Sequence, residues 1–596
     1  MSTNIETDAE QLAYHGGEMS PDSALDTMRH SAAHVMAAAV LEIFPDAKFA
    51  IGPAIENGFY YDFDLPRSLT PEDFPKIEQR MARLVEADNP FVRNELPRSD
   101  ALQEFADQPY KIEIIQDLPE DAVISTFGQA HFIDLCRGPH VPSAGKIGPM
   151  KLLSVAAAYW RGDEHRPQLQ RLYGTAWPSQ AELDDYLWRL EEARKRDHRR
   201  LGRDLDLFMV SDQVGGGLVI WLPNGATIRR ELENYIVNAE IRDGYQHVYS
   251  PHIAKIELYK TSGHWQHYRD SMYAPIKIDD EEYILRPMNC PHHIMAYKHD
   301  LHSYRELPLR LAELGTVYRY EKSGELTGMS RVRGFTINDA HIFCRPDQLR
   351  DEFVGVLRLI QELYDAVGFR DFVFRVSLRD PADTEKYVEG DEMWNVAENA
   401  IREALDAEGV EYVEAVGEAA FYGPKLDIMV RDVLGREFAA STNQVDLYLP
   451  ERFDLQYIEA DGSRRRPAMI HRAAIGSMER FFAFLTEQHA GAFPVWLSPK
   501  QAVVIPIADR HLEYAEQVAA RLRGEGVRVS VDSRSERMNA KIRDAQMQKI
   551  PYMLVVGDRE AEAGAAAVRL RSGEDLKARP LDEVVGLLQA DIRERR

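Results

Sequence analysis

The chain is 596 residues long, 44% apolar and 28% charged, with a formal net charge of −25. This length predicts three or four domains of ordinary globular composition. There is no run of about 18 apolar residues, and the start is acidic and polar, so we expect neither a membrane span nor an export signal. The only cysteines are Cys136, Cys290 and Cys344, which indicates a reducing, cytoplasmic environment rather than a disulfide framework. The acidity lies upstream of Trp496, so the net charge does not exclude a local basic face.

Residues 1–20 are polar, and we expect them to be disordered. Apolar residues then recur at helical spacing, which predicts a helix capped by Ser20 or Asp22. His30 and His34 lie four residues apart and therefore share one face of that helix. Taken alone, the pair either lies on the helix surface by chance, or packs locally, or forms half of a site.

Alternating apolar and polar residues around Asn57–Gly58 predict a hairpin, and a helix is expected in TPEDFPKIEQRMARLVEAD. Farther on, Cys136 and His140 flank Gly138–Pro139, which predicts a turn. The HxxxH and CxxxH patterns together resemble the editing domain of bacterial threonyl-tRNA synthetases, over about residues 21–178. The resemblance implies a pocket that activates water, binds ribose and hydrolyses seryl-tRNA. Its residues are expected to be His30, His34, Cys136, His140 and Asp134, with Tyr60 and Tyr61 also matching. A structural zinc site of two His, a Cys and a His stays open as an alternative.

Residues 179–206 read as one long charged helix, which we expect to link two domains and otherwise to present a solvated surface. From about Leu207, a strand, a long helix and a strand ending at Pro251 resemble motif 1 of class II aminoacyl-tRNA synthetases, their dimer element. His264 follows among aromatic residues. It is either a packed core histidine or, by the resemblance, a residue that handles the terminal ribose of tRNA.

Residues 284–343 carry the densest pattern in the chain. YRYEKSGELTGMSRVRGF holds two runs of Arg and aromatic residues around a Gly-containing loop, which predicts an antiparallel hairpin with a long turn. It resembles the motif 2 hairpin of class II synthetases. The preceding RPMNCPHH resembles the zinc-ligand segment of threonyl-tRNA synthetases.

By their surrounding motifs, Cys290, His341 and His471 match the zinc ligands of that family, which implies one Zn²⁺ per subunit. Three protein ligands leave a fourth position open, as in reactive zinc sites. An apolar pocket would separate threonine from valine by only about 10²-fold, whereas a metal that binds both amine and hydroxyl rejects valine. Asp339 can accept the hydroxyl proton. Serine also carries both groups, so a second, hydrolytic site is needed, and the HxxxH/CxxxH domain supplies it.

Adenylate formation needs cations around the phosphates of ATP and a surface on which adenine stacks. The resemblance assigns these roles to the hairpin and to GSMERF, which resembles motif 3 from Gly476 onward. The expected ATP-binding residues are Arg319, Glu321, Arg331, Phe335 and Arg480, with Arg333 beside them and Mg²⁺ accompanying ATP. The expected substrate-binding residues are Met288, Asp339, Tyr422 and Gln444, and the expected catalytic residues are Arg319, Arg480, Lys425 and His264. Any one of these arginines could instead be a surface salt-bridge partner. That alternative does not explain why all of them lie within the motifs. The sequence departs from the family pattern at Ile337, Ala439, Asn443 and His292.

From residue 496, strands alternate with helices, which predicts an open mixed α/β sheet. This part resembles the anticodon-binding domain shared by threonyl-, prolyl-, histidyl- and glycyl-tRNA synthetases. Lys549, Glu560 and Arg569 match positions that read anticodon bases, and Ser535 stands where Asn is usual.

We therefore expect a multidomain α+β protein: an N-terminal α+β editing domain (21–178), a linker helix (179–206), a class II catalytic core on an antiparallel sheet (207–495) and a C-terminal α/β anticodon-binding domain (496–596). Many bacterial relatives begin with a ubiquitin-like domain, which this sequence is expected to lack. The resemblance implies a homodimer that acts on ATP, L-threonine and tRNA(Thr), with no membrane partner. The rivals are a non-catalytic RNA-binding regulator and a zinc hydrolase built on the His pair.

Overall fold

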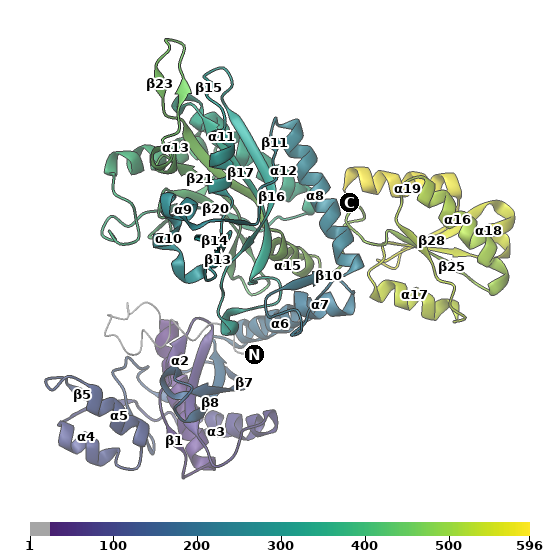
Figure 1. The fold of residues 1–596 in the computed structure, drawn as a ribbon. Helices are drawn as coiled ribbons and strands as arrows, with labels where there is room; N and C mark the ends of the chain where they lie inside the picture. Colours follow the sequence, from purple (N-terminus) through teal and green to yellow (C-terminus); the bar gives the residue numbers. More distant parts are fainter. Residues whose placement is uncertain (1–23, 596) are drawn as a thin grey trace. The chain divides into compact units, whose positions relative to one another are not determined.

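The computed structural model describes residues 24–595 of the chain, which divide into two compact units with the boundary between Leu190 and Glu191 (Figure 1). The expected disordered tail and the caps at Ser20 and Asp22 lie outside the described residues. Within residues 24–595, none of the helices combines the length and the apolar character that a membrane crossing requires.

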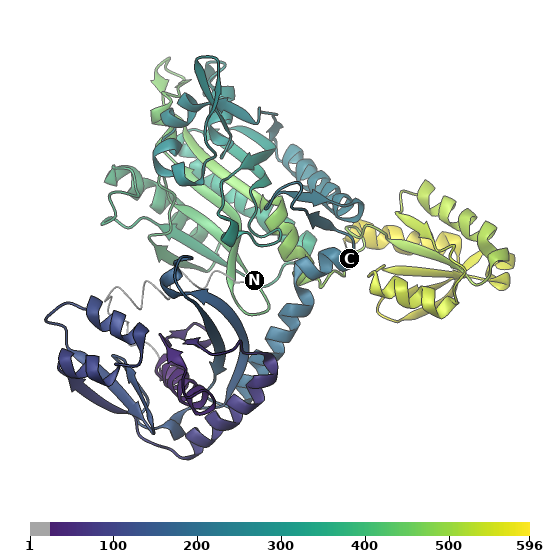
Figure 2. The same cartoon turned by 60° about the horizontal axis from the view of Figure 1, so that its bottom comes forward.

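The N-terminal unit is built on one buried helix that lies against an antiparallel sheet (Figure 2). The predicted helix is confirmed as α2 (Ala24–Ile43), whose middle is buried because Ala, Val and Met occupy most of its positions. The sheet has the order β1-β3-β8-β7, with β2 paired to β3. Its strands are β1 (Lys48–Phe49), β2 (Ala54–Ile55), β3 (Gly58–Asp64), β7 (Met150–Tyr159) and β8 (Gln168–Ala176).

The predicted hairpin is confirmed between β2 and β3, where Ile55 pairs with Gly58. Gly58 is required there because a Cβ atom would lie 2.2 Å from the carbonyl oxygen of Gly174. The second predicted helix is confirmed as α3 (Phe74–Glu86). A smaller sheet, β4-β5-β6, leads into the predicted turn at Cys136. Its strands are β4 (Val92–Leu96), β5 (Ile124–Gln129) and β6 (Phe132–Leu135), beside α4 (Arg98–Glu104) and α5 (Pro109–Asp117).

The expectation of one helix over residues 179–206 is wrong. The structure has α6 (Gln180–Arg196) and α7 (His198–Asp204), separated at Asp197. The Asp197 carboxylate accepts a hydrogen bond from the Arg199 backbone N–H (2.8 Å), so it caps a new helix instead of continuing the old one. The boundary between the two units also falls inside α6 and not at its end.

The second unit contains an eight-stranded sheet of order β11-β16-β17-β24-β21-β20-β18-β19, antiparallel except at its two edges. The predicted hairpin with a long turn is confirmed as β16 and β17. The predicted long helix is α8 (Pro223–Arg242), but the strand after it ends at His247, before Pro251. The strands are β11 (Gln246–His247), β16 (Leu309–Tyr318), β17 (Gly334–Cys344), β18 (Phe372–Leu378), β19 (Tyr412–Val416), β20 (Lys425–Arg431), β21 (Glu437–Asp446) and β24 (Ala468–Ser477).

The register of the central strands aligns a row of polar residues on one face of this sheet. Lys425 pairs with Gln444, Gln444 with His471, and His471 with His341, across β20, β21, β24 and β17. Residues directly opposite on neighbouring strands point to the same face. Alternate residues, including Val445, point to the other face and join the largest apolar core, to which four helices contribute. These helices are α8, α12 (Leu349–Val367), α13 (Asp391–Ala407) and α15 (Met478–Gln488).

The last part of the chain forms the predicted open mixed sheet, of order β26-β25-β27-β28-β29. β26, β25 and β27 run parallel, whereas β28 and β29 are antiparallel. The strands are β25 (Ala502–Pro506), β26 (Val529–Val531), β27 (Tyr552–Val556), β28 (Ala565–Leu570) and β29 (Asp575–Pro580). The helices are α16 (Leu512–Gly524), α17 (Met538–Met547), α18 (Asp558–Ala563) and α19 (Leu581–Glu594).

Candidate active sites

Three candidate metal ligands meet on the polar face of the central sheet. Cys290 begins α11 (Cys290–Tyr297), while His341 and His471 are paired residues of β17 and β24. One donor atom from each lies within 4.8 Å of the others, and all three side chains are buried. The sheet register thus brings together residues that are far apart in the sequence.

The chemistry of this group fits a zinc ion. Two imidazoles and a thiol are zinc donors, and each imidazole has its remote nitrogen occupied. His471 Nε2 lies 2.7 Å from Asp446 Oδ2, and His341 Nδ1 lies 2.8 Å from His293 Nδ1. The other nitrogen of each ring is left for a ligand. Burial raises the pKa of the Cys290 thiol, so a bound cation would have to displace its proton.

The expected threonine contacts surround the same point. The Tyr422 hydroxyl donates to Gln444 Oε1 (2.5 Å), and its ring stacks on that of His471 at a centroid distance of 4.9 Å. Asp339 Oδ2 accepts a hydrogen bond from the amide of Asn289 (3.0 Å). His264 is buried with Nε2 3.7 Å from Cys290 Sγ, so it lines the site instead of belonging to a separate core. Burial lowers the pKa of His264 to about 3, which keeps it neutral.

Cations gather beside this pocket. Arg319 donates to the Met288 sulfur (3.2 Å) and packs over the Phe335 ring at 5.1 Å. Desolvation lowers the pKa of Arg480, although the residue as a whole is exposed, and repulsion from Arg319 and Arg331 lowers it further. Guanidinium groups that repel one another in this way are suited to binding a polyanion.

Three other expected residues, Arg331, Lys425 and Arg333, are engaged in ion pairs or hydrogen bonds. Arg331 Nε lies 2.8 Å from Glu321, so this pair must open if Glu321 is to reach an adenine amino group. Lys425 lies 2.8 Å from Asp427. Arg333 donates to the backbone oxygen of Glu321 (2.9 Å) and therefore supports the hairpin turn.

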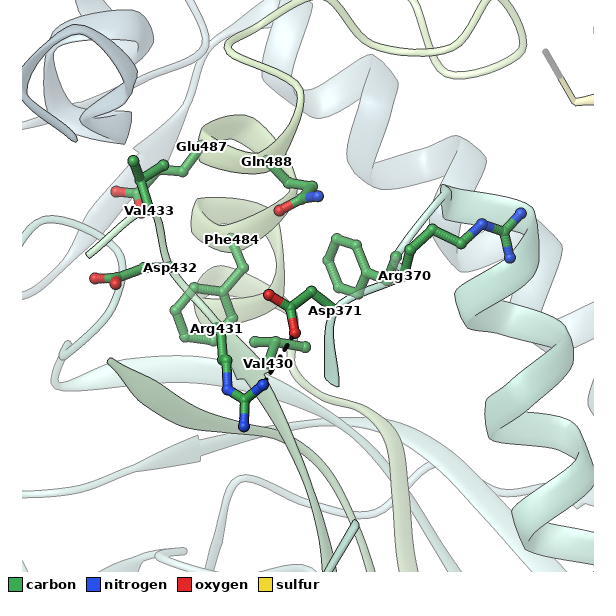
Figure 3. A pocket seen from close by; sticks show the side chains of 10 residues that line it. Arg370, Asp371, Val430, Arg431, Asp432, Val433, Phe484, Glu487 and Gln488 are labelled. Atoms are coloured by element: carbon green, nitrogen blue, oxygen red, sulfur yellow. Dashed lines mark hydrogen bonds and ion pairs between the residues drawn. The ribbon is translucent and has the colours of Figure 1, made fainter. Parts of the chain in front are cut away.

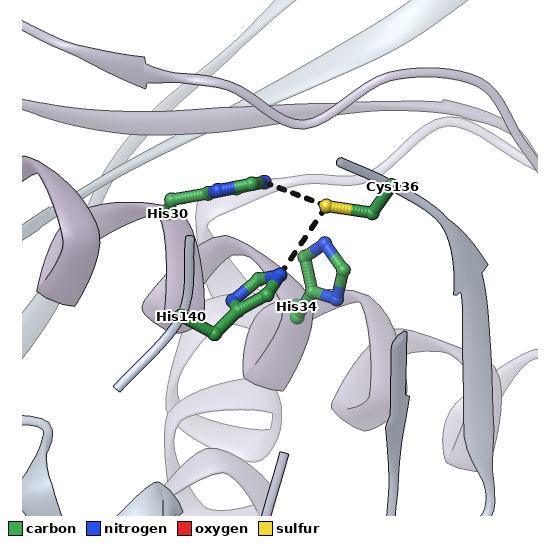
Figure 4. A group of neighbouring side chains, drawn as sticks. All are labelled: His30, His34, Cys136 and His140. Atoms are coloured by element: carbon green, nitrogen blue, oxygen red, sulfur yellow. Dashed lines mark hydrogen bonds between the residues drawn. The ribbon is translucent and has the colours of Figure 1, made fainter. Parts of the chain in front are cut away.

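A second cluster forms in the N-terminal unit from α2 and the turn after β6 (Figure 4). Cys136 Sγ lies 3.4 Å from His30 Nε2 and 3.3 Å from His140 Nε2. His34 completes the group, and its Nε2 lies 3.4 Å from Asp134. Both halves of the sequence pattern are thereby brought together.

Hydrogen bonds fix the proton positions in this cluster. His30 Nδ1 lies 3.2 Å from the carbonyl oxygen of Pro139, so that nitrogen carries the proton. The Ser31 hydroxyl donates to Thr27 and lies 3.0 Å from His140 Nδ1, which must therefore be the donor. Both Nε2 lone pairs then face Cys136, whose single S–H can serve only one of them. One imidazole remains available as a base or as a ligand.

Burial also sets the charge of the cluster. It lowers the pKa of His30, His34 and His140 and raises the pKa of Cys136 to about 12. Without a metal, the four groups are neutral at pH 7. A neutral imidazole suits proton abstraction and hydroxyl binding, whereas a neutral thiol is a poor nucleophile.

Lys111, a buried cation of α5, contacts Asp134 beside this cluster and was not predicted from the sequence. Its Nζ lies 2.5 Å from Asp134 Oδ1 and 3.2 Å from the Tyr61 hydroxyl, which itself donates to Asp134 Oδ2 (2.6 Å). Nothing in the sequence around Lys111 marks it, because a single lysine in an amphipathic helix is ordinary. His293 was also missed, although it lies one helical turn after Cys290 on the same face of α11.

A third His-containing group has a structural explanation. His198 Nδ1 lies 2.7 Å from Glu487, and its Nε2 accepts a hydrogen bond from the Met329 backbone N–H (3.1 Å). Both ring nitrogens are used, so none is left for a metal. His198 instead joins α7 to α15 and to the turn of the β16–β17 hairpin.

A small pocket elsewhere in the second unit contains none of the expected residues (Figure 3). It is lined by apolar side chains such as Phe369 and Phe484, and by Arg431, which pairs with Asp371 at 3.3 Å. We assign no reaction to it.

The three expected anticodon residues do not form one cluster. Lys549 precedes β27 and Glu560 follows it, so they lie at opposite ends of that strand. Arg569 pairs with Met553 near the first end. Glu560 accepts the Gly557 backbone N–H (3.0 Å) and caps α18.

Comparisons with known proteins cover most of the chain. Residues 119–173 match the family "Threonyl and Alanyl tRNA synthetase second additional domain", residues 273–489 the "tRNA synthetase class II core domain (G, H, P, S and T)", and residues 501–591 the "Anticodon binding domain". The chain is 56% identical to threonine–tRNA ligase 1 of Bacillus subtilis (strain 168), over 95% of this chain and 88% of that protein. It is 55% identical to the threonine–tRNA ligase of Geobacillus kaustophilus (strain HTA426), over 96% and 88%.

The chain is also similar to solved structures described as threonyl-tRNA synthetases. A structure described as the RNA binding domain of threonyl-tRNA synthetase from Cryptosporidium parvum Iowa II is 39% identical, with a TM-score of 0.63 over 66% of this chain and 98% of that one. A putative threonyl-tRNA synthetase from Aeropyrum pernix is 30% identical, with a TM-score of 0.59 over 67% and 96%.

Proposed function

Because the chain belongs to the threonine–tRNA ligases, a family of class II aminoacyl-tRNA synthetases, we propose a division of its chemistry between the two clusters described above. The chain joins threonine to tRNA at the expense of ATP. The domains we propose are an editing domain (21–178), a linker (179–206), a catalytic core (207–495) and an anticodon-binding domain (496–596).

The observation that carries the proposal is the convergence of Cys290, His341 and His471 on one point of the sheet. These residues would hold one Zn²⁺ per subunit, which would bind the amine and hydroxyl of threonine and discriminate against valine. Asp339 lies two residues before His341 on β17 with its side chain 15% exposed, and partial desolvation raises the pKa of its carboxyl group. It suits the acceptance of a proton from the substrate hydroxyl. Gln444 and Tyr422 would orient the amino acid.

Arg319 and Arg480 would bind the phosphates of ATP, accompanied by Mg²⁺, because fixed guanidinium groups stabilise charge that develops at the α-phosphate. Phe335 presents a ring for adenine, and Lys425 and His264 flank the substrates. The Arg331–Glu321 pair would open as ATP enters, Arg331 turning to phosphate and Glu321 to the adenine amino group.

In the editing domain, His30, His34, Cys136, His140 and Asp134 would hold the terminal ribose and a water molecule. The free imidazole lone pair beside Cys136 supplies a base for hydrolysis of seryl-tRNA. A zinc ion bound by the same donor atoms is the second candidate, since the four donor atoms lie within 4.8 Å of one another.

We further propose that tRNA(Thr) is read by Lys549, Glu560 and Arg569, that the protein works in the cytoplasm, and that it forms a homodimer. Support for the dimer comes from exposed apolar side chains in and after the motif 1 helix: Ile241 is 58% exposed, Tyr249 95% and Ile253 40%. Large apolar side chains left exposed on a subunit are of the kind that an interface covers.

One experiment tests the proposal: charging of tRNA with threonine, serine and valine side by side, together with zinc content. We expect threonine to be charged, valine to be rejected and one zinc to be present per chain. The zinc should be lost in Cys290→Ala and kept in Cys136→Ala. Zinc lost only in Cys136→Ala would favour the zinc hydrolase, and no threonine-dependent pyrophosphate exchange with zinc present would favour the RNA-binding regulator.

A further inference from the structure

A chain of buried hydrogen bonds leads away from one of the proposed zinc ligands. His341 Nδ1 lies 2.8 Å from His293 Nδ1, and His293 Nε2 lies 3.2 Å from Glu313 Oε2. None of the three side chains is more than 4% exposed. Two imidazoles that face each other through nitrogen atoms can form this bond only if one nitrogen carries a proton and the other does not.

Glu313, at the far end of this series of hydrogen bonds, determines which of the two Nδ1 atoms carries the proton. Besides His293, Glu313 is bound only by donors: the Ser250 backbone N–H (3.0 Å), the Ser250 hydroxyl (2.6 Å) and the Arg286 guanidinium (3.3 Å). Although burial alone would raise the pKa of Glu313, hydrogen bonds from His293 and Ser250 bring it down to about 2. Glu313 is therefore a carboxylate that can only accept hydrogen bonds.

The remaining proton positions follow in order. His293 must donate from Nε2 to Glu313, so the tautomer that makes this bond with a single ring proton has its lone pair at Nδ1. That lone pair accepts the proton of His341 Nδ1. His341 is then left with its lone pair on Nε2, which lies 3.7 Å from Asp339 Oδ1 and is the nitrogen that a metal would use.

We propose that Glu313 and His293 are positioning residues that hold His341 in the tautomer able to bind zinc. This inference rests on the zinc site proposed above. The contact differs from that of His471, whose remote nitrogen meets the Asp446 carboxylate directly. At His341 the carboxylate acts through a second imidazole. Changing one atom of Glu313 can therefore reverse the donor and acceptor roles in both hydrogen bonds between Glu313 and His341.

Glu313→Gln makes that change with little change of shape. The amide oxygen keeps the Arg286 side, and the amide nitrogen donates to His293 Nε2. His293 must then carry its proton on Nδ1 and donate to His341, which moves the His341 proton onto Nε2 and blocks the ligand atom. We expect zinc affinity to fall about 10- to 100-fold, the usual effect of losing an outer hydrogen-bond partner of a ligand.

His293→Gln separates the direction of the bonds from the presence of the ring. A glutamine can donate to Glu313 through its nitrogen and accept from His341 through its oxygen, so the original direction is preserved. We expect this variant to bind zinc more tightly than Glu313→Gln. A merely structural role for His293 predicts the reverse order, because loss of a buried ring creates a cavity.

The measurement is zinc affinity of the full chain, by competition between added Zn²⁺ and a chromophoric chelator. Glu352→Gln is the matched control: it removes a carboxylate paired with Arg310 (2.6 Å) and should leave zinc affinity unchanged. Circular dichroism tests whether each variant is folded, and isotope-edited NMR of the His341 ring reports its tautomer directly in the variant and the wild type. A Glu313→Gln variant that binds zinc within about twofold of wild type, or a His341 proton on Nε2 in the wild type, would overturn the positioning role of Glu313 and His293 alone. A wild type that binds no zinc would overturn the site as well.

Discussion

Lys111 is a buried cation next to the cluster of His30, His34, Cys136 and His140, and its charge is balanced by Asp134. The two groups lie 2.5 Å apart, and their side chains are 2% and 3% exposed. Lys111→Met leaves the carboxylate buried without its counter-charge, which costs about 3–5 kcal/mol. We expect the N-terminal unit to unfold at lower urea concentration while threonylation is retained. Hydrogen exchange of the α2 amides along a urea series measures this.

The double variant Lys111→Met/Asp134→Asn identifies the source of the loss. If the stranded charge is responsible, the double variant recovers part of the stability, since the two residues are coupled. Lys151→Met is the matched control, because its pair with Glu78 is 2.9 Å long but 47% exposed at Lys151, and it should cost less than about 1 kcal/mol. A double variant no more stable than Lys111→Met would contradict the explanation.

The buried imidazoles of the same cluster make the N-terminal unit sensitive to acid. Burial lowers the pKa of His30, His34 and His140 in the folded chain, whereas in the unfolded chain they titrate near about 6.5. Below that pH the imidazoles bind protons in the unfolded state but not in the folded state. Their contribution to the free energy of unfolding is therefore present above about pH 6.5 and is lost as the pH falls. Each neutral imidazole contributes a slope of up to about 1.4 kcal/mol per pH unit.

We expect α2 amide protection, corrected for intrinsic exchange, to fall between pH 7 and pH 5. His140→Phe should make the slope shallower, because one buried imidazole is gone and a ring still stacks on Phe91. His165→Gln, at an exposed position, should leave the slope unchanged. Equal slopes in the wild type and His140→Phe would rule out this origin of the acid sensitivity.

Prediction of individual residues depended on whether the sequence carries a motif around them. Cys290, His341 and His471 stand in recognisable segments, so a resemblance located them although their spacing could not. Lys111 has no recognisable motif around it, and its partner Asp134 lies on another element. His293 and Glu313 become important only through contacts between α11 and β16, which no local pattern encodes.

At the scale of elements, periodicity and turn residues predicted α2, the β2–β3 hairpin, the β16–β17 hairpin and the mixed C-terminal sheet. The sequence does carry a signal for the break at Asp197, since Asp is a preferred helix cap. The row Lys425–Gln444–His471–His341 could not be predicted, because it depends on the register of β24 with β21 and with β17, which are not its neighbours in sequence.

His198 links three elements around the proposed ATP site. It bonds to Glu487 on α15 and to the Met329 N–H in the hairpin turn, next to Ser330, whose carbonyl accepts from Arg480 (3.0 Å). His198→Ala frees the turn and the arginine it helps to position. We expect KM for ATP to rise about tenfold with little change in KM for threonine, measured by pyrophosphate exchange.

Arg200→Ala is the control for this prediction, since it alters an exposed residue of the same short helix. Gly328→Ala offers an independent route to the same effect, because a Cβ there would lie 2.2 Å from His198 Nε2. If His198→Ala changed both Michaelis constants alike, the role of His198 would be general stability and not positioning of the turn.

At the scale of the whole molecule, the two clusters lie in different compact units, one in each. The proposed metal ion would test for a hydroxyl and an amine, and serine carries both. Loss of one methyl group from the substrate is worth only about 1–3 kcal/mol, so this test alone would let serine reach tRNA too often for accurate translation. The proposed selection therefore requires a separate hydrolytic unit, and we expect a variant in one unit to leave the reaction of the other intact.

Cys136→Ala tests that independence. It removes the thiol between His30 and His140 and leaves the catalytic unit untouched, so we expect threonylation at the wild-type rate together with accumulation of seryl-tRNA(Thr). Charging with serine and with threonine, followed over time on the same tRNA, measures both. Cys344→Ala, a buried thiol outside both clusters, is the control and should not release seryl-tRNA. If serine and threonine charging fell together in Cys136→Ala, the two units would not divide the work, because a residue of one would be limiting for the reaction of the other.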